Sequence, residues 1–114
     1  MLKITPDPKF SADVQITIPG QEKPESLPLT FRYMNRLQYV ELLSSFEEEK
    51  DKKGKVIKEG KTQIEAFPEF VLGWGLEEEF VKENIELFLN NYPAAYREIF
   101  SAYSRLLIES RVKN

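Results

Sequence analysis

The C-terminal stretch that decides the fold reads NYPAAYREIFSAYSRLLI and covers residues 91–108. Its apolar residues recur every three or four positions, a spacing that places side chains on one face of an α-helix. The members of this face are Tyr96, Ile99, Phe100, Tyr103, Leu106, Leu107 and Ser110. Pro93 suits the first helical turn, and we expect the helix to run to about Arg111. A face this aromatic needs a cover, either the rest of this chain or a second chain.

Two stretches near the N-terminus alternate between apolar and polar residues, which is the pattern of half-buried β-strands. The first runs from Phe10 to Ile18, and Pro19-Gly20 ends it. The second runs from Leu27 to Tyr33 after a loop of about eight residues. Because Pro28 cannot donate a backbone hydrogen bond, we expect this strand to start after Pro28 or to lie at a sheet edge. The two stretches predict an antiparallel β-hairpin.

A helix should follow the hairpin, with Asn35 as its N-cap and an end near Glu49. We expect its apolar stripe to pack on the hairpin, which is marginal in water without a cover. The stripe consists of Leu37, Tyr39, Val40, Leu42, Leu43 and Phe46.

Helical spacing resumes over residues 64–74, where Pro68 should start or kink the helix. Gly73 and Gly75 bracket Trp74 and should fix the indole at the end of this helix. A short amphipathic helix from about Glu83 to Asn90 precedes the terminal helix. The predicted fold class is therefore α+β, an N-terminal antiparallel β-hairpin packed against three to four α-helices, with a long C-terminal helix.

Charged residues of both signs dominate residues 47–61, where Val56 and Ile57 alone are apolar. Such a composition cannot bury enough apolar surface to offset chain ordering. We therefore expect a single domain over residues 1–114 with a flexible charged loop at about 47–61. Gly60-Lys61-Thr62 ends like a phosphate-binding loop, but the glycine that the motif requires five positions earlier is replaced by Lys55.

The composition favours a protein without catalytic activity or cofactor. The chain has no cysteine and no histidine, which excludes disulfides, Ser-His-Asp machinery and Cys-His machinery. The net charge of −3 gives no basic field for nucleic acid. No apolar run approaches the roughly 20 residues that a membrane span requires. Five glutamates between residues 77 and 86 leave a carboxylate metal site open, but the run lacks the spaced ligands around a glycine turn that a calcium site uses, and the preference for acidic residues at a helix start explains it better.

A domain of this size seldom buries eight Phe, five Tyr and one Trp completely. Aromatic residues dominate the energetics of protein interfaces. Simple packing in the core accounts for most of these residues, but some should remain exposed, so we expect the terminal helix or the tryptophan corner to take part in oligomerisation or partner binding. The candidate interface residues are Trp74, Phe70, Phe100, Tyr103, Leu106 and Leu107.

The order of short motifs along the chain resembles the tail assembly chaperones of long-tailed bacteriophages. The matching pieces are Ile16-Thr17-Ile18-Pro19-Gly20, Leu29-Thr30-Phe31-Arg32-Tyr33, Gly73-Trp74, Glu83-Asn84-Ile85, Asn91-Tyr92-Pro93-Ala94-Ala95 and Ala102-Tyr103. The tryptophan corner and the Tyr-Pro-Ala-Ala entry to the last helix carry most of the resemblance. Gly75-Leu76 departs from it, since the family is expected to have an acidic residue after the tryptophan.

The resemblance implies a small non-enzymatic assembly factor that binds the hydrophobic tape measure protein, with tail tube subunits as a second partner. It further implies a homo-oligomer in the cytoplasm of the bacterial host that is absent from the mature virion. Two alternatives remain open. One is a structural tail or neck protein retained in the virion, and the other is a carboxylate-based metal-binding domain.

Overall fold

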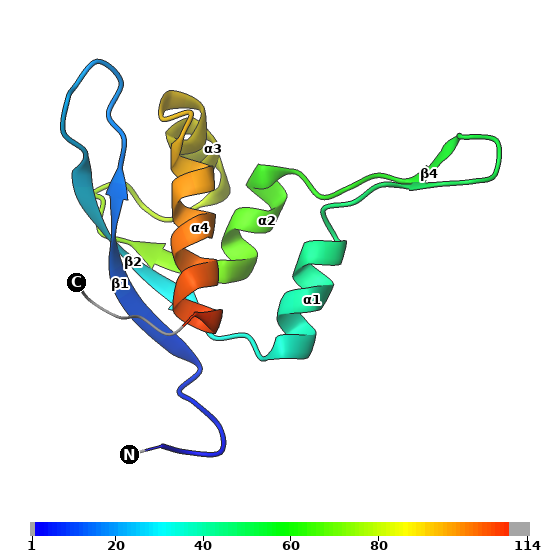
Figure 1. Cartoon of the computed structure of the whole chain (residues 1–114). Helices are drawn as coiled ribbons and strands as arrows, with labels where there is room; N and C mark the ends of the chain where they lie inside the picture. Colours follow the sequence, from blue (N-terminus) through cyan, green and yellow to red (C-terminus); the bar gives the residue numbers. More distant parts are fainter. Residues whose placement is uncertain (1, 110–114) are drawn as a thin grey trace.

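The computed structural model describes residues 2–109, in which α2, α3 and α4 stand on one side of a three-stranded antiparallel sheet (Figure 1). In chain order the elements are β1 (Lys9–Ile16), β2 (Glu25–Arg32), α1 (Arg36–Ser44), β3 (Glu49–Lys50), β4 (Val56–Lys58), α2 (Gln63–Phe70), β5 (Val71–Trp74), α3 (Lys82–Asn91) and α4 (Ala95–Ile108). The predicted α+β class, with its N-terminal hairpin and long C-terminal helix, is confirmed. Ser110 and the predicted helix end at Arg111 lie outside the described residues.

The sheet has the order β1-β2-β5, so β2 is its central strand. Pro28 lies inside β2, and the prediction that this strand starts after Pro28 or lies at an edge is wrong. The carbonyl of Pro28 points toward the β5 side, where it accepts a hydrogen bond from the Gly75 N–H at 2.9 Å. An N–H at the same residue would point the same way, away from β1. The proline therefore removes no hydrogen bond from the β1–β2 ladder.

α2 begins five residues before Pro68, which lies within the helix. The side chain of Thr62 accepts the N–H of Glu65, and the Glu65 carboxylate accepts the N–H of Thr62, which together form a capping box. The helix ends at Phe70, so the prediction that Trp74 sits at a helix end is wrong. Instead, Val71–Trp74 pairs with β2, because the backbone of the central strand offers hydrogen bonds that override a weak local preference.

The core lies between the sheet and the helices that cover it. Its largest fully buried side chains are Tyr103, Phe31, Phe67, Phe70, Leu29, Ile99 and Val71. They come from β2, α2, β5 and α4, so the core depends on contacts between distant parts of the chain.

α1 has the predicted N-cap, since the Asn35 side chain accepts the Gln38 N–H at 2.9 Å and forms a capping box. The helix ends at Ser44 and not near Glu49. The prediction that its whole apolar stripe packs on the hairpin is wrong, because only Tyr39 and Leu42 are buried. α2, α3 and α4 already stand on that side of the sheet, and α1 lies farther out (Figure 1).

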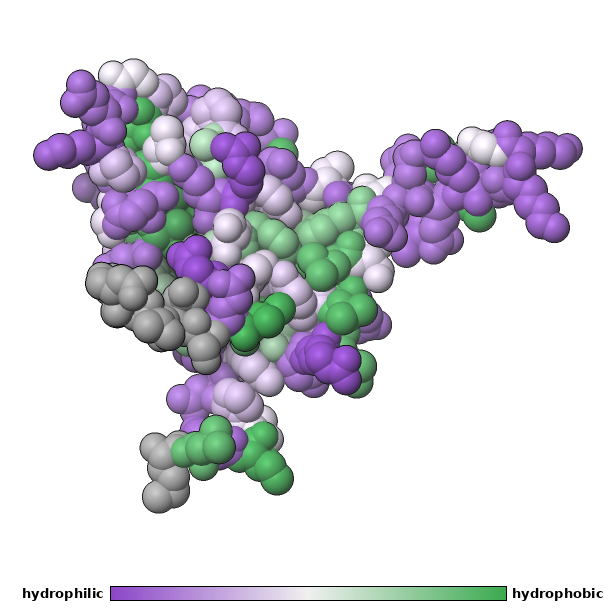
Figure 2. Space-filling view, in the orientation of Figure 1, coloured by the Kyte–Doolittle hydropathy of each residue, from purple (hydrophilic) through white to green (hydrophobic). Residues whose placement is uncertain are grey.

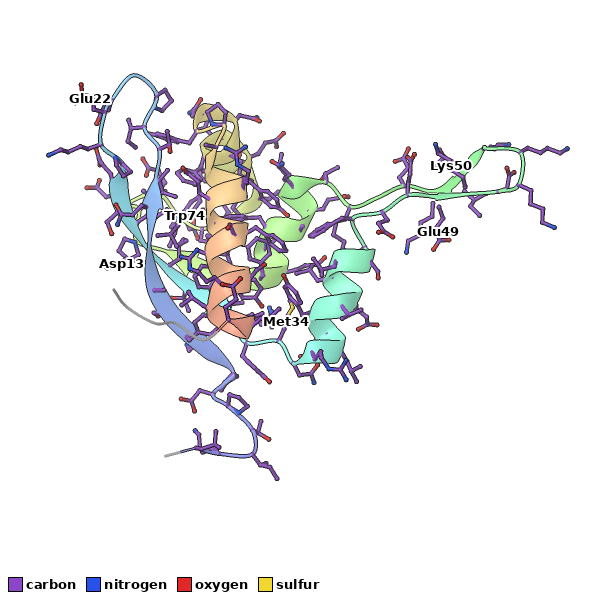
Figure 3. All side chains as sticks on the ribbon, in the orientation of Figure 1. Asp13, Glu22, Met34, Glu49, Lys50 and Trp74 are labelled. Carbon is purple, nitrogen blue, oxygen red and sulfur yellow. The ribbon has the colours of Figure 1, made fainter. Side chains whose placement is uncertain are left out.

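Residues 47–61 include β3 and β4, which form a two-stranded ribbon that projects from the body (Figure 1). At the turn, the Asp51 carboxylate accepts the N–H groups of Lys53 and Lys55, both at 2.9 Å. Gly54 has a φ of 85°, a backbone conformation that glycine adopts without steric cost. All of residues 47–59, called the hairpin arm below, are exposed. Glu49 and Lys50 extend from it into solvent (Figure 3). The flexibility of this segment stays a prediction.

Gly60, Lys61 and Thr62 anchor the base of the hairpin arm. A Cβ atom at Gly60 would lie 2.2 Å from the carbonyl oxygen of Phe46, so only glycine fits this close backbone approach. The Lys61 ammonium pairs with the Glu69 carboxylate, and Thr62 caps α2. Gly60-Lys61-Thr62, which resembles the end of a phosphate-binding loop, therefore has a structural role.

Candidate protein-binding surface

α4 buries one of its sides against the sheet and α2. Tyr103 is fully buried, and its hydroxyl donates a hydrogen bond to the Arg32 carbonyl oxygen at 2.7 Å. Its ring lies 5.2 Å from that of Phe31 and 5.1 Å from that of Phe70, measured between ring centroids. Burial raises the pKa of the Tyr103 phenol well above its usual range. Tyr103 is therefore a neutral core residue through which α4 contacts β2 and α2.

The neighbouring side of α4 packs against α1. The ring of Phe100 is stacked 6.4 Å from that of Tyr39 and meets the ring of Phe46 edge-on at 5.6 Å. The hydroxyls of Tyr39 and Ser104 lie 2.5 Å apart and share a hydrogen bond. Because Phe100 and Ser104 are only partly buried, this seam between the two helices reaches the molecular surface.

The rest of α1 exposes aliphatic side chains beside that seam. Leu37, Val40 and Leu43 are 70%, 50% and 39% exposed. Figure 2 shows hydrophobic residues gathered over α1 and the adjoining side of α4. We call this region the α1–α4 surface, and its members are Leu37, Val40, Leu43, Phe46, Phe100 and Leu107. A contiguous apolar patch of this kind commonly marks a site of protein association.

The predicted interface residues fall in different environments. Phe70 and Tyr103 are fully buried, so they support the core and offer no surface to a partner in this conformation. Phe100 and Leu107 belong to the α1–α4 surface. Leu106 is 39% exposed, but it stands about 100° around the helix from Leu107.

Trp74 lies in β5 and is partly buried. Its indole N–H donates to the Glu78 carbonyl oxygen at 2.8 Å, and its ring meets those of Phe80 and Phe88 edge-on at 5.1 Å and 5.5 Å. These contacts fix the orientation of the ring. The tryptophan is thus held at a boundary between the core and a surface groove.

That groove has a volume of about 310 Å³ and lies between the end of the β1–β2 hairpin, the chain after β5, and α3. We call it the Trp74 groove. Its apolar lining consists of Ile16, Ile18, Leu27, Trp74, Leu76, Leu87, Phe88 and Tyr92. Its polar lining consists of Glu25, Ser26, Glu78, Asn84 and Asn91. An apolar floor with carboxylates suits an apolar side chain accompanied by cations.

Sequence reasoning missed the α1 part of the α1–α4 surface. The signal lay in the stripe itself, because Leu37 and Val40 are offset from Tyr39 and Leu42 around the helix. Six apolar residues at these positions cover more of the circumference than one packed face can bury. Part of the stripe therefore had to face solvent or a partner.

Among residues 2–109, no group of three or more acidic, histidine or cysteine side chains is placed to hold a metal ion. In the same range, no helix has the length and apolar character to cross a membrane. Burial and the nearby Glu69 raise the pKa of Tyr96 from 10.0 to about 12.

Residues 1–114 match a protein family described as phage tail assembly chaperone. The chain belongs to this family. The resemblance inferred from the short motifs is thereby confirmed, and the family implies protein partners in the assembly of the phage tail. No match is found among curated proteins or among solved structures.

Proposed function

We propose that this tail assembly chaperone binds the tape measure protein through the α1–α4 surface. The observation that carries the proposal is the exposed row of Leu37, Val40 and Leu43 beside the aromatic seam of Phe46 and Phe100. Tape measure segments bound there are shielded from water until tail tube subunits polymerise and displace the chaperone. The chaperone acts in the host cytoplasm without a catalytic step.

The size of the patch suits binding that can be reversed. Complete burial of one Val or Leu side chain contributes about 1.5–3 kcal/mol, and Leu37, Val40 and Leu43 are already partly covered. Association also costs several kcal/mol of lost translational and rotational freedom. Three partly exposed aliphatic residues with an aromatic border therefore give moderate affinity, which a chaperone needs in order to release its client.

Co-expression with the tape measure protein tests this proposal directly. The wild-type chain should be retained with a tagged tape measure protein, and the double variant Leu37→Gln/Val40→Gln should be lost from it. Both positions are exposed, so the variant should unfold at nearly the wild-type temperature. Ile4→Gln is the matched control, because Ile4 is a fully exposed aliphatic residue outside the α1–α4 surface. Failure of the wild type to associate, or full retention of the double variant, would contradict the proposal.

We further propose that the protein leaves the tail before the virion is complete. A chaperone that covers client surface has to give way to the tube that occupies the same surface. Mass spectrometry of purified particles should therefore find no stoichiometric amount of this chain. Its presence at a fixed copy number would favour the alternative, a structural tail or neck protein.

A further inference from the structure

The negative charge of this protein is concentrated around the Trp74 groove. The two segments that line the groove, residues 16–27 and 74–92, together contain seven glutamates and two lysines, a net charge of −5. The whole chain has a net charge of −3, so all the other residues together carry +2. A partner that enters the groove therefore meets a field of one sign.

Two of these glutamates line the groove itself and have no partner of their own. They are Glu25 in β2 and Glu78, which follows β5. Within residues 2–109, neither carboxylate forms an ion pair or accepts a hydrogen bond. The described residues that line the groove include no lysine or arginine. Nothing on its walls compensates this negative charge.

The apolar part of the groove combines a fixed surface with an exposed one. The indole of Trp74 is held by its hydrogen bond to the Glu78 carbonyl oxygen at 2.8 Å and by the ring of Phe88 at 5.5 Å. Leu87 on α3 is 58% exposed and stands beside them in the lining. Because the indole is already oriented, covering it costs little further conformational freedom.

The size and the charge of the groove together define the occupant that fits it. Its volume of about 310 Å³ lies at the lower end of the range of about 300–1,000 Å³ for small-molecule sites. This space suits one large side chain of a peptide. Lysine or arginine residues next to that side chain would compensate the glutamates, whereas an acidic peptide would be repelled.

We propose that the Trp74 groove binds a segment of a partner protein that presents one large aliphatic side chain between lysine or arginine residues. The aliphatic side chain lies against Trp74 and Leu87, and the cations lie beside Glu25 and Glu78. Because both glutamates are exposed to solvent, salt should screen their attraction and weaken the contact.

This second site goes beyond the proposed client binding and does not depend on it. The α1–α4 surface shares no residue with the lining of the groove. The experiment therefore uses the purified full chain and a synthetic peptide without a tape measure protein, so that failure of either proposal is recognised separately.

Trp74 reports directly on the occupancy of the groove, because it is the only tryptophan of the chain. The probe is the peptide Gly-Ser-Lys-Lys-Leu-Lys-Lys-Ser-Gly, which has no tryptophan. Titration should change the tryptophan emission up to a plateau, with a dissociation constant of about 1 mM or lower, the scale of one buried leucine with two exposed ion pairs. The same peptide with serine in place of leucine should bind at least about tenfold more weakly. The peptide with glutamate in place of every lysine should not bind.

A pair of charge variants tests the role of the two glutamates. Glu25→Gln/Glu78→Gln should weaken binding of the leucine peptide by about 2–30-fold at low salt and by less at high salt. Glu47→Gln/Glu59→Gln is the matched control, because it removes the same charge from exposed positions on the hairpin arm. The control should bind the peptide as the wild type does.

A pair of single variants tests the apolar wall. Leu87→Gln should weaken binding, whereas Ile57→Gln, the same kind of change at an equally exposed site on the hairpin arm, should not. The double variant Leu37→Gln/Val40→Gln should also bind as the wild type does. All changed positions are exposed, so thermal unfolding followed by circular dichroism should show every variant folded.

Three results would each overturn the proposal. One is a wild type whose tryptophan emission shows no saturable change with the leucine peptide. Another is equal binding of the leucine peptide and the serine or glutamate peptide. The third is a groove variant that binds the leucine peptide as tightly as its matched control on the hairpin arm.

Discussion

The placement of Tyr103 makes a quantitative prediction about the stability of the fold. Tyr103→Ala should lower the free energy of unfolding by about 3–5 kcal/mol, the usual cost of removing a fully buried aromatic ring. Tyr103→Phe keeps the ring and removes only the hydrogen bond to the Arg32 carbonyl, so its expected cost is about 1 kcal/mol. The difference of about 2–4 kcal/mol measures the packing of the ring against neighbours such as Phe31 and Phe70.

Urea unfolding followed by circular dichroism measures both variants, and the melting temperature should fall by about 4 °C per kcal/mol for a domain of this size. Phe100→Ala is a useful comparison, because that ring is only partly buried and should contribute less. If Tyr103→Ala had the same urea midpoint of unfolding as the wild type but no longer bound the tape measure protein, Tyr103 would be a contact with the partner. Equal losses in the Ala and Phe variants would refute the packing argument.

Three further predictions concern a close contact, a helix cap and the ionisation of tyrosine. Gly60→Ala places a Cβ 2.2 Å from the Phe46 carbonyl oxygen, and thermal unfolding should show a loss of about 1–3 kcal/mol as the backbone shifts. Thr62→Ala removes the side-chain cap of α2 and should cost about 1 kcal/mol in urea unfolding, whereas Thr62→Ser should cost little. The pKa of Tyr96 is raised from 10.0 to about 12 by folding. The contribution of its neutral phenol to the free energy of unfolding is therefore complete below pH 10 and is lost as the pH rises toward 12. Urea unfolding at several alkaline pH values should show this decline, and Tyr96→Phe should make it less steep.

Local signals predicted the elements whose stabilising contacts lie close in sequence. Asn35 is followed three residues later by Gln38, and that pair forms a capping box whose contacts are confined to four residues of the sequence. In β1 the alternation separates buried Val14 and Ile16 from exposed Asp13 and Gln15, because a half-buried strand has a period of two. Such features need no knowledge of the tertiary fold.

The errors concern elements whose state depends on distant partners. Val71–Trp74 has a spacing compatible with a helix, but it forms a strand that pairs with β2. The local sequence does not show that a distant strand is available for pairing. The position of α1 was wrong for a related reason. An apolar stripe indicates that a helix packs against other elements, but it does not identify them. In the structure, Tyr39 packs against α4. For the candidate site, the sequence could not separate core residues from surface residues: the set was chosen from large apolar residues, and two of them, Phe70 and Tyr103, are buried in the core. The interface itself stays a prediction.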